Sequence, residues 1–237
     1  MKVGIIGCGL IGQKRAASLG NNTLSAVADT DITKAYTLAL NHTSVKVFSD
    51  YKELLKEDID IVVVSTTNNV LSKIALDAIN SGKHVLIEKP GAIHYTEFDP
   101  LISAAKKNSV KVKIGYNLRY HRAINETIGM CDIGKIGEIM FIRAHYGHGG
   151  RLGYEKEWRA DPLISGGGEL TDQGSHLLDL SQCFLGDLHL KSSSIKTYFW
   201  DMPVEDNAFM ILENTDGKIA FLSTSCTEWK NTFQFEI

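Results

Sequence analysis

Short apolar runs alternate with amphipathic segments along the first half of the chain. Runs of β-branched and aliphatic residues with little polar alternation are typical of buried parallel strands whose two faces are both covered. Such runs predict strands over residues 2–6, 24–28, 45–48, 60–65, 84–87 and 110–114. Apolar positions at helical spacing predict helices over residues 10–19, 31–41, 51–56, 70–82 and 95–108. This alternation predicts an α/β fold with a doubly wound parallel sheet.

The pattern changes after Gly115, where strands no longer alternate regularly with helices. A turn sequence, Asn214-Thr215-Asp216-Gly217, predicts a hairpin between two of the later strands. The predicted strands are 139–146, 194–200, 207–214, 218–227 and 233–237, with a helix over 170–184. We therefore expect a Rossmann-type domain over 1–115 and an α+β domain with a mostly antiparallel sheet over 116–237. Gly115 is the expected hinge, and we expect substrate and cofactor to meet in the cleft between the domains.

A glycine-rich turn follows the first predicted strand, with the spacing G-x-G-x-x-G. Glycines at this spacing allow a tight turn and a close approach of a pyrophosphate to the N-terminus of the next helix. Asp29 ends the second strand, where a dinucleotide-binding unit places the acid that accepts from the ribose hydroxyls. A plain glycine turn is the alternative. The expected cofactor contacts in this segment are Gly7, Gly9, Leu10, Ile11, Gly12 and Asp29.

Asp29 also favours NAD over NADP. At ~4 Å and an effective dielectric constant near 20, each contact between its carboxylate and a 2′-phosphate costs about 4 kcal/mol. No arginine follows immediately to offset that repulsion. Further along, Thr66 and Asn68 follow the fourth strand at the carboxyl edge of the sheet, where such sheets bind ligands.

Glu88-Lys89-Pro90 ends the next strand at the same edge of the sheet. Pro90 restricts Lys89 to extended conformations and allows a cis Lys89–Pro90 bond. A solvated strand end is the alternative to a functional site. We expect Glu88 and Lys89 to contact the cofactor and Lys89 to transfer a proton.

A second glycine-rich segment, 166–168, precedes the helix predicted over 170–184. Asp172 and His176 lie four residues apart and therefore on one helical face. A carboxylate beside an imidazole raises its basicity, so His176 is a candidate to accept the proton of an alcohol. A structural Asp–His pair is one alternative. Half of a metal site is another, but His145 and His148 lie on opposite faces of a strand, so we predict no metal.

A polar and aromatic stretch precedes that helix, and it suits the binding of a hydroxyl-rich or anionic molecule. Arginine makes bidentate contacts with carboxylates and phosphates. An ordinary surface loop is the alternative. The candidate substrate-binding residues are Arg119, Tyr146, His148, Arg151, Trp158 and Arg159.

Composition excludes several other classes of partner. The chain has 25 basic and 28 acidic residues among 237 and a net charge of −3, without the basic surface that binds nucleic acid or anionic membranes. Its apolar runs have the length of strands, far below the roughly 20 residues of a membrane span. The four cysteines form no C-x-x-C pair, which favours a reducing, cytoplasmic location.

Taken together, these motifs resemble the Gfo/Idh/MocA family of NAD(P)-dependent sugar and cyclitol dehydrogenases. The resemblance covers essentially the whole chain. It is carried by residues 7–12, Glu88-Lys89-Pro90 with Glu97 seven residues on, residues 116–120, and Gly166-Gly167-Gly168 before Asp172 and His176. It implies that Lys89 and His176 transfer protons, that Asp172 binds or orients the reacting hydroxyl, and that the sheet domains pair into homo-oligomers, as dimers or tetramers.

The resulting hypothesis is an oxidoreductase that moves a hydride between a carbinol of a sugar, nucleotide sugar or cyclitol and a nicotinamide. Alternatives are a lyase- or glycosidase-like enzyme that oxidises its substrate transiently, and a non-catalytic module that senses NAD. Members of the family are usually longer, and this chain ends inside a predicted strand. A truncated product or a shortened variant is therefore expected, and an inactive structural remnant is a further alternative.

Overall fold

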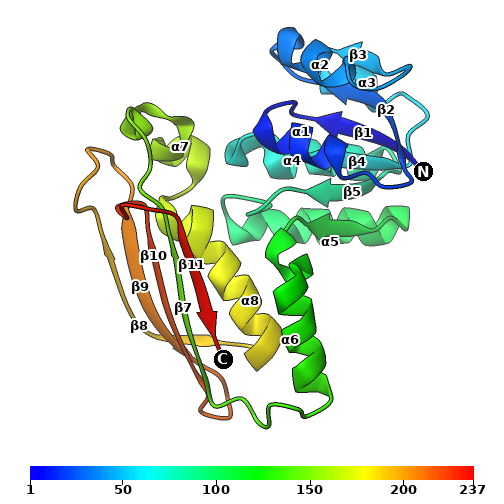
Figure 1. Ribbon diagram of the computed structural model, residues 1–237. Helices are drawn as coiled ribbons and strands as arrows, with labels where there is room; N and C mark the ends of the chain where they lie inside the picture. Colours follow the sequence, from blue (N-terminus) through cyan, green and yellow to red (C-terminus); the bar gives the residue numbers. More distant parts are fainter. The chain divides into compact units, whose positions relative to one another are not determined.

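The computed structural model describes residues 1–237, and the chain forms two compact units. The N-terminal unit is Met1–Gly115 and the C-terminal unit is Tyr116–Ile237. Figure 1 labels their elements. Each unit has a sheet and a hydrophobic core of its own. No helix combines the length and hydrophobicity of a membrane span.

The N-terminal unit is a six-stranded sheet with the strand order β3-β2-β1-β4-β5-β6 and parallel pairing throughout. This arrangement confirms the predicted doubly wound sheet. Its strands are β1 (Lys2–Ile6), β2 (Thr23–Ala28), β3 (Lys46–Phe48), β4 (Ile61–Val64), β5 (His84–Ile87) and β6 (Val112–Ile114). Its helices are α1 (Leu10–Ala17), α2 (Ile32–Ala39), α3 (Tyr51–Leu54), α4 (Asn68–Asn80) and α5 (Phe98–Asn108).

Helices cover both faces of this sheet. Along β4, Val62 and Val64 pack into one core with α3, α4 and α5, while Val63 packs into another with α1 and α2. The apolar run of β4 therefore alternates between two buried faces, as its lack of polar positions predicted. Asp31 and Asp50 cap α2 and α3 by accepting from backbone N–H groups two residues on.

The C-terminal unit contains a five-stranded sheet with the order β11-β7-β10-β9-β8. Only β7 and β10 pair in parallel, so the sheet is mostly antiparallel, as predicted. The strands are β7 (Phe141–Gly147), β8 (His189–Lys196), β9 (Asn207–Glu213), β10 (Ile219–Ser225) and β11 (Thr232–Glu236). The helices are α6 (Arg122–Asp132), α7 (Pro162–Ser165) and α8 (Ser175–Leu185), the last preceded by a π-helical turn, Leu170–Gly174.

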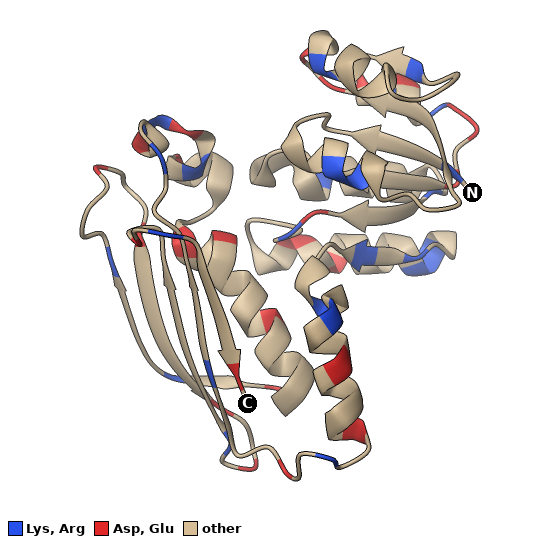
Figure 2. Cartoon of the chain, viewed as in Figure 1, with Lys and Arg blue, Asp and Glu red and all other residues tan.

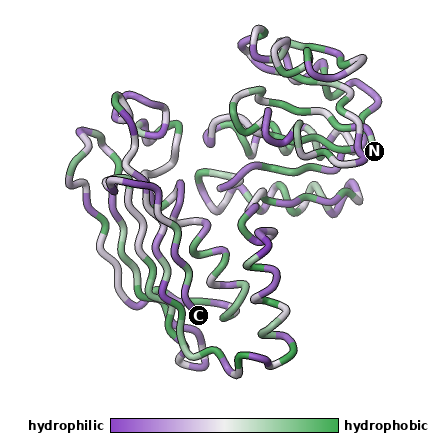
Figure 3. The backbone as a smooth tube through the Cα atoms, in the orientation of Figure 1, coloured by the Kyte–Doolittle hydropathy of each residue, from purple (hydrophilic) through white to green (hydrophobic).

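One face of this second sheet packs against α8, and the other is exposed. Figure 3 shows hydrophobic and polar positions mixed along its strands. On the inner face, Ile142 and Leu222 form a core with Leu177 of α8. The outer face carries large apolar side chains, each between 38% and 46% exposed, that align through the strand register. They are Phe141, Phe209, Ile211, Ile219 and Phe221.

The strand predicted over 194–200 is confirmed only for 194–196, because β8 covers His189–Lys196 and ends before that segment does. The reason is Asp206, whose carboxylate accepts from the backbone N–H groups of Tyr198, Phe199 and Trp200. Three successive amides that converge on one carboxylate cannot also continue a strand ladder. The apolar pattern of 194–200 gave no sign of this loop.

Two helical predictions are also corrected. Helix α6 was not predicted at all, since only Ile124 of its residues is buried. In α1, not all of the apolar positions that predicted the helix are buried, since Leu10, Ile11 and Ala17 are exposed, Leu10 at 68% and Ile11 at 37%. The small residues Gly12 and Ala16 take the buried face, because α1 approaches the sheet closely there.

Candidate active site

The three glycines of the turn between β1 and α1 differ in whether there is room for a Cβ atom. Gly7 has φ +93°, and a Cβ there would lie 2.5 Å from the carbonyl oxygen of Ser65. A Cβ on Gly12 would lie 2.1 Å from the carbonyl oxygen of Gly7. The fold itself therefore requires glycine at these positions. A Cβ on Gly9 would meet no atom within 4 Å, so the space beside Gly9 is open.

The N-terminus of α1 opens onto that space. Gly9 is its N-cap residue, no side chain caps the helix, and its first turn has no acidic residue. The first N–H groups of a helix have no partners within the helix, and they carry the positive end of its dipole. These features fit a bound pyrophosphate group.

Asp29 is anchored to the same turn. Its Oδ2 accepts from the backbone N–H of Cys8 at 2.7 Å, and its Oδ1 accepts from the N–H of Asp31 at 2.8 Å. An ionised carboxylate accepts about four hydrogen bonds, so acceptor capacity remains. Burial, with Asp29 adding to it, raises the pKa of the Cys8 thiol to about 12, so this cysteine stays a neutral packing group.

Glu88 and Lys89 follow β5, and the structure gives them different surroundings. The Glu88 carboxylate is buried and forms an ion pair with Arg15 of α1. A Cβ on Gly115 would lie 3.1 Å from this carboxylate, so Gly115 leaves room for it. Lys89 is half-buried. The Lys89–Pro90 bond is cis, which the sequence had predicted only as possible. Arg15 thus holds the segment next to the candidate catalytic lysine.

Glu97 fixes the loop that follows Pro90. Its Oε1 accepts from the backbone N–H of His94 at 2.8 Å, and its Oε2 accepts from the hydroxyl of Ser72 in α4. Burial opposes the charge of Glu97, but the hydrogen bonds from Ser72 and the backbone outweigh burial and lower its pKa. Glu97 therefore acts as a charged anchor between α4 and this loop.

In the C-terminal unit, the glycine triplet packs directly on the segment before β9. The Oε1 atom of Glu205 accepts from the N–H groups of Gly168 and Leu170, each at 3.1 Å. A Cβ on Gly168 would lie 2.0 Å from the carbonyl oxygen of Glu205. The triplet is therefore needed for backbone packing, and an internal carboxylate occupies its amides.

Asp172 lies within the π-helical turn, and Arg159 holds it. The Nε of Arg159 donates to Oδ2 of Asp172 at 3.1 Å, and its guanidinium lies over the Trp158 ring at 4.5 Å. π-Helical turns inside helices occur frequently at functional sites. A π-helical turn also changes the simple i, i+4 relation between Asp172 and His176 on which the sequence prediction relied.

His176 is buried at the start of α8 between two tyrosines. The ring of Tyr116 meets it edge-on at 5.7 Å, and the ring of Tyr146 lies at 6.2 Å. Burial raises the pKa of both tyrosines, and the nearby carboxylates Asp179 and Asp172 raise it further, so both hydroxyls stay protonated and can donate.

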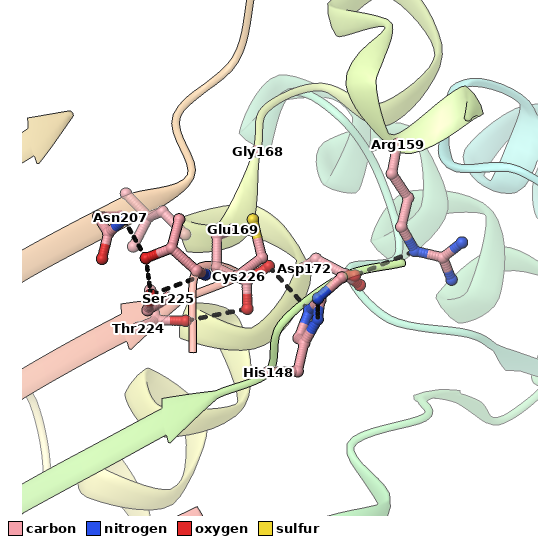
Figure 4. Close-up of polar contacts among 12 residues, drawn as sticks. His148, Arg159, Gly168, Glu169, Asp172, Asn207, Thr224, Ser225 and Cys226 are labelled. Carbon is pink, nitrogen blue, oxygen red and sulfur yellow. Dashed lines mark hydrogen bonds and ion pairs between the residues drawn. The ribbon is translucent and has the colours of Figure 1, made fainter. Parts of the chain in front are cut away.

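Glu169 and His148 form a buried pair beside Asp172 (Figure 4). The Nε2 of His148 lies 3.3 Å from Oε2 of Glu169, and Thr224 donates to Oε1 of Glu169 at 3.3 Å. Hydrogen bonding to Glu169 raises the pKa of His148, while burial raises the pKa of Glu169. His145 lies elsewhere, against Ser223 and Glu228.

Arg119 is bound to α8. Its Nε and Nη2 donate to the two carboxylate oxygens of Asp179 at 2.7 and 2.6 Å. Asp179 lies one helical turn beyond His176, and Tyr116 contacts His176 itself. The short segment after Gly115 thus braces the part of α8 that carries His176.

The family described as "Oxidoreductase family, NAD-binding Rossmann fold" matches residues 1–116, and the "GFO/IDH/MocA C-terminal domain" matches residues 126–237. The chain belongs to the Gfo/Idh/MocA family. The predicted resemblance is therefore confirmed, and the N-terminal unit is an NAD-binding Rossmann fold of this family.

Several relatives of the chain are named as dehydrogenases. Trans-1,2-dihydrobenzene-1,2-diol dehydrogenase of Xenopus tropicalis is 28% identical over 201 residues, which cover 84% of this chain and 60% of the relative. Inositol 2-dehydrogenase of Salmonella typhimurium is 30% identical over 154 residues, which cover 62% and 46%. The chain thus spans about 60% or less of these relatives. Levoglucosan dehydrogenase in complex with NADH, at 21% identity and a TM-score of 0.92 over 100% of this chain and 70% of that one, shares the fold.

Within this Gfo/Idh/MocA chain, the predicted residues fall into two sets. The glycine turn, Asp29, Thr66, Asn68, Glu88 and Lys89 belong to the N-terminal unit. Asp172, His176 and the six candidate substrate residues belong to the C-terminal unit, where Arg159 meets Asp172 and Tyr146 meets His176.

Sequence reasoning missed Arg15, Glu169, Asp179 and Glu205, which hold the predicted residues in place. Glu88 and Arg119 indicated that partners such as Arg15 and Asp179 were needed, but not where they lie, because a buried or half-buried charge needs an opposite charge nearby. The partners come from distant segments, 73 residues away for Arg15 and 60 for Asp179. No local spacing identifies contacts at such separations.

Proposed function

We propose that this chain is the NAD-dependent dehydrogenase part of a protein that oxidises a CH–OH group of a sugar or cyclitol. The observation that carries the proposal is the uncapped, open N-terminus of α1 beside Gly9, in a chain that also presents Asp172 and a buried His176 at the start of α8. Family membership and the names of the relatives support it.

In this proposal the glycine turn holds the cofactor pyrophosphate through the amides at the N-terminus of α1, with Leu10 and Ile11 exposed around them. Asp29 accepts from the adenosine ribose and disfavours the 2′-phosphate of NADP. Thr66 and Asn68, at the start of α4, complete the contacts. Glu88 anchors this edge through Arg15, which leaves Lys89 as the residue that reaches the cofactor.

NAD bound there supplies a hydride acceptor at C4 of its nicotinamide. Asp172 orients the hydroxyl, and Arg159 fixes the carboxylate of Asp172. As hydride leaves the carbon that bears the hydroxyl, the one hydroxyl proton passes from oxygen to Lys89 or His176, a contribution of about 10²-fold to 10⁴-fold.

For the substrate, we propose contacts with Tyr146, His148, Arg151, Trp158 and Arg159. Arg159 binds Asp172, and Asp172 acts electrostatically on Tyr146 and His148. Arg151 and Arg159 share Glu157. Arg119 is assigned a different task from the one predicted. Because two of its N–H groups bind Asp179, it braces α8 and positions His176 rather than contacting substrate.

We also propose that the chain forms a homo-oligomer through the outer face of the second sheet. Monomeric proteins rarely expose contiguous apolar patches of that kind, and Phe141, Ile219 and Phe221 lie side by side there. The cytoplasmic location stays a prediction.

The direct test is NADH formation with NAD and a panel of sugars and cyclitols, compared between wild type and Lys89→Ala. We expect kcat to fall by about 10²-fold or more, and NAD affinity to fall much less, because the glycine turn and Asp29 still hold the cofactor. Lys73→Ala, an exposed lysine of α4, is the matched control and should keep wild-type activity. Substrate conversion without net NADH would favour transient oxidation, and NAD binding without any conversion would favour a sensing module.

A further inference from the structure

Every arginine of the candidate substrate set has a carboxylate partner within the C-terminal unit. Arg119 binds Asp179 at 2.6 and 2.7 Å, and Arg159 binds Asp172 at 3.1 Å. Arg151 binds a third carboxylate, that of Glu157, at 2.7 Å. Positive and negative side chains are interleaved through residues 151–172, as Figure 2 shows around α7. Each of these three guanidinium groups therefore has at least one carboxylate partner.

Glu157 is the carboxylate that lies near two of these arginines, Arg151 and Arg159. Its Oε2 accepts from Nη2 of Arg151 at 2.7 Å and lies 3.7 Å from Nη1 of Arg159. Its backbone is fixed on both sides, since its N–H donates to Tyr154 and its carbonyl accepts from Ala160. The Glu157 side chain is 21% exposed, against 69% for Arg151, so the carboxylate lies beneath the cation.

Such a surface presents hydrogen-bond donors and acceptors side by side. The carboxylates of Glu157 and Asp172 only accept, and the guanidinium groups of Arg151 and Arg159 only donate. A sugar hydroxyl both donates and accepts, so it can engage either kind of group. A carboxylate or phosphate on a ligand only accepts, and next to Glu157 and Asp172 it meets like charge.

We propose that Glu157 is a specificity residue, which neutralises Arg151 and Arg159 and makes the site select uncharged polyols over sugar acids and sugar phosphates. This inference rests on the proposed function and names its substrate class. Removal of the Glu157 charge would leave Arg151 without its partner and Arg159 with Asp172 alone. The two guanidinium groups would then suit an anionic substituent, because arginine binds carboxylate in a bidentate geometry.

The experiment compares sugars that differ only in one acid group, glucose with glucuronate and galactose with galacturonate. For wild type, kcat/KM for the neutral member should exceed that for the acid by about tenfold or more. Glu157→Gln should lower this ratio by about tenfold or more, and added salt should raise the KM of the acid in this variant. Glu157→Asp keeps the charge and should retain most of the wild-type ratio.

Glu155→Gln is the matched control, because it removes the same charge two residues away and Glu155 takes part in none of these ion pairs. It should leave the ratio unchanged. Melting temperatures of all variants exclude misfolding as the cause. Wild type that prefers the acids, or a Glu157→Gln ratio equal to that of wild type, would overturn the proposal.

Sugar dissociation constants measured calorimetrically with NADH present give the same ratio without turnover. One outcome is that NADH binds, that the sugars bind with the expected ratio of dissociation constants, and that neither wild type nor any variant oxidises them. In that case the dehydrogenase proposal fails while the assignment of Glu157 stands. If oxidation occurs but the ratio of dissociation constants favours the acids, the assignment of Glu157 fails alone.

Discussion

The chain has two glycine-rich segments before helices, and the backbone N–H groups of the two segments have different surroundings. At Gly7–Gly12 the amides at the start of α1 have no capping side chain, and the space beside Gly9 is open. At Gly166–Gly168 the carboxylate of Glu205 takes the amides of Gly168 and Leu170. Glycine content is the same, but only the first segment leaves its donors for a ligand. What lies in front of the amides distinguishes a binding site from a structural joint.

A third set of amides extends the comparison. Tyr198, Phe199 and Trp200 donate to Asp206, whose side chain is fully buried, without any glycine in the loop. Burial alone would raise the pKa of Asp206, but the hydrogen bonds from the Asn207 amide and these backbone groups outweigh it and hold the pKa below its usual range. Internal carboxylates thus fill two of the three amide clusters.

The largest effect should follow Gly168→Ala. The added Cβ would lie 2.0 Å from the carbonyl oxygen of Glu205, a backbone atom that cannot move aside without disturbing the segment before β9. We expect a loss of about 3 kcal/mol or more in the free energy of unfolding. Urea unfolding followed by tryptophan fluorescence measures it, because Trp158, Trp200 and Trp229 all lie in the C-terminal unit.

Gly129→Ala is the control for that measurement. Gly129 lies in the exposed part of α6, and a Cβ there meets no atom within 4 Å. We expect this variant to gain about 0.5–1 kcal/mol from the higher helix propensity of alanine. If Gly168→Ala were as stable as Gly129→Ala, the triplet would not be required for packing on Glu205.

The next effect concerns Asp206→Asn. At pH 7 we expect a loss of about 2 kcal/mol, because hydrogen bonds to a charged acceptor become bonds to a neutral one. The folded-state pKa lies below the ordinary aspartate value of 3.8, so the charge stabilises the fold above pH 3.8. This stabilisation is lost as pH falls through the folded pKa. The stability difference between wild type and variant should therefore shrink below pH 3.8, and a difference independent of pH would contradict this role.

The elements of the N-terminal unit were largely predictable from the sequence, because apolar strand patterns and helix caps both depend on residues close together in the chain. Strands such as β4 are apolar throughout, and caps such as Asp31 act on the amide two residues on. The C-terminal unit was less predictable. Its loop at 198–200 depends on Asp206, and the end of β8 at Lys196 follows from that contact rather than from the apolar pattern of the segment.

The candidate site divides in the same way. Gly7, Gly9, Gly12 and Asp29 form a motif within thirty residues, so spacing alone located them. Arg119 was predicted as a substrate ligand because its type and place suited one, yet Asp179 occupies two of its donors. The sequence shows that a side chain is charged. Whether an opposite charge already forms an ion pair with it depends on the fold.

The smallest effect on stability, and the sharpest test of the comparison, should come from Gly9→Ala. Gly9 has φ −68° and ψ −165°, which alanine also adopts, and its Cβ would meet no protein atom. We expect the free energy of unfolding to change by less than about 1 kcal/mol, since the lower N-cap preference of alanine opposes its lower entropy in the unfolded chain. The new methyl group would instead occupy the space in front of the α1 amides. The dissociation constant for NAD, measured calorimetrically, should rise by about tenfold or more. Gly129→Ala, in the other unit, should bind NAD as wild type does. A Gly9→Ala variant with unchanged NAD affinity would show that this turn, like the triplet at Gly168, serves only the fold.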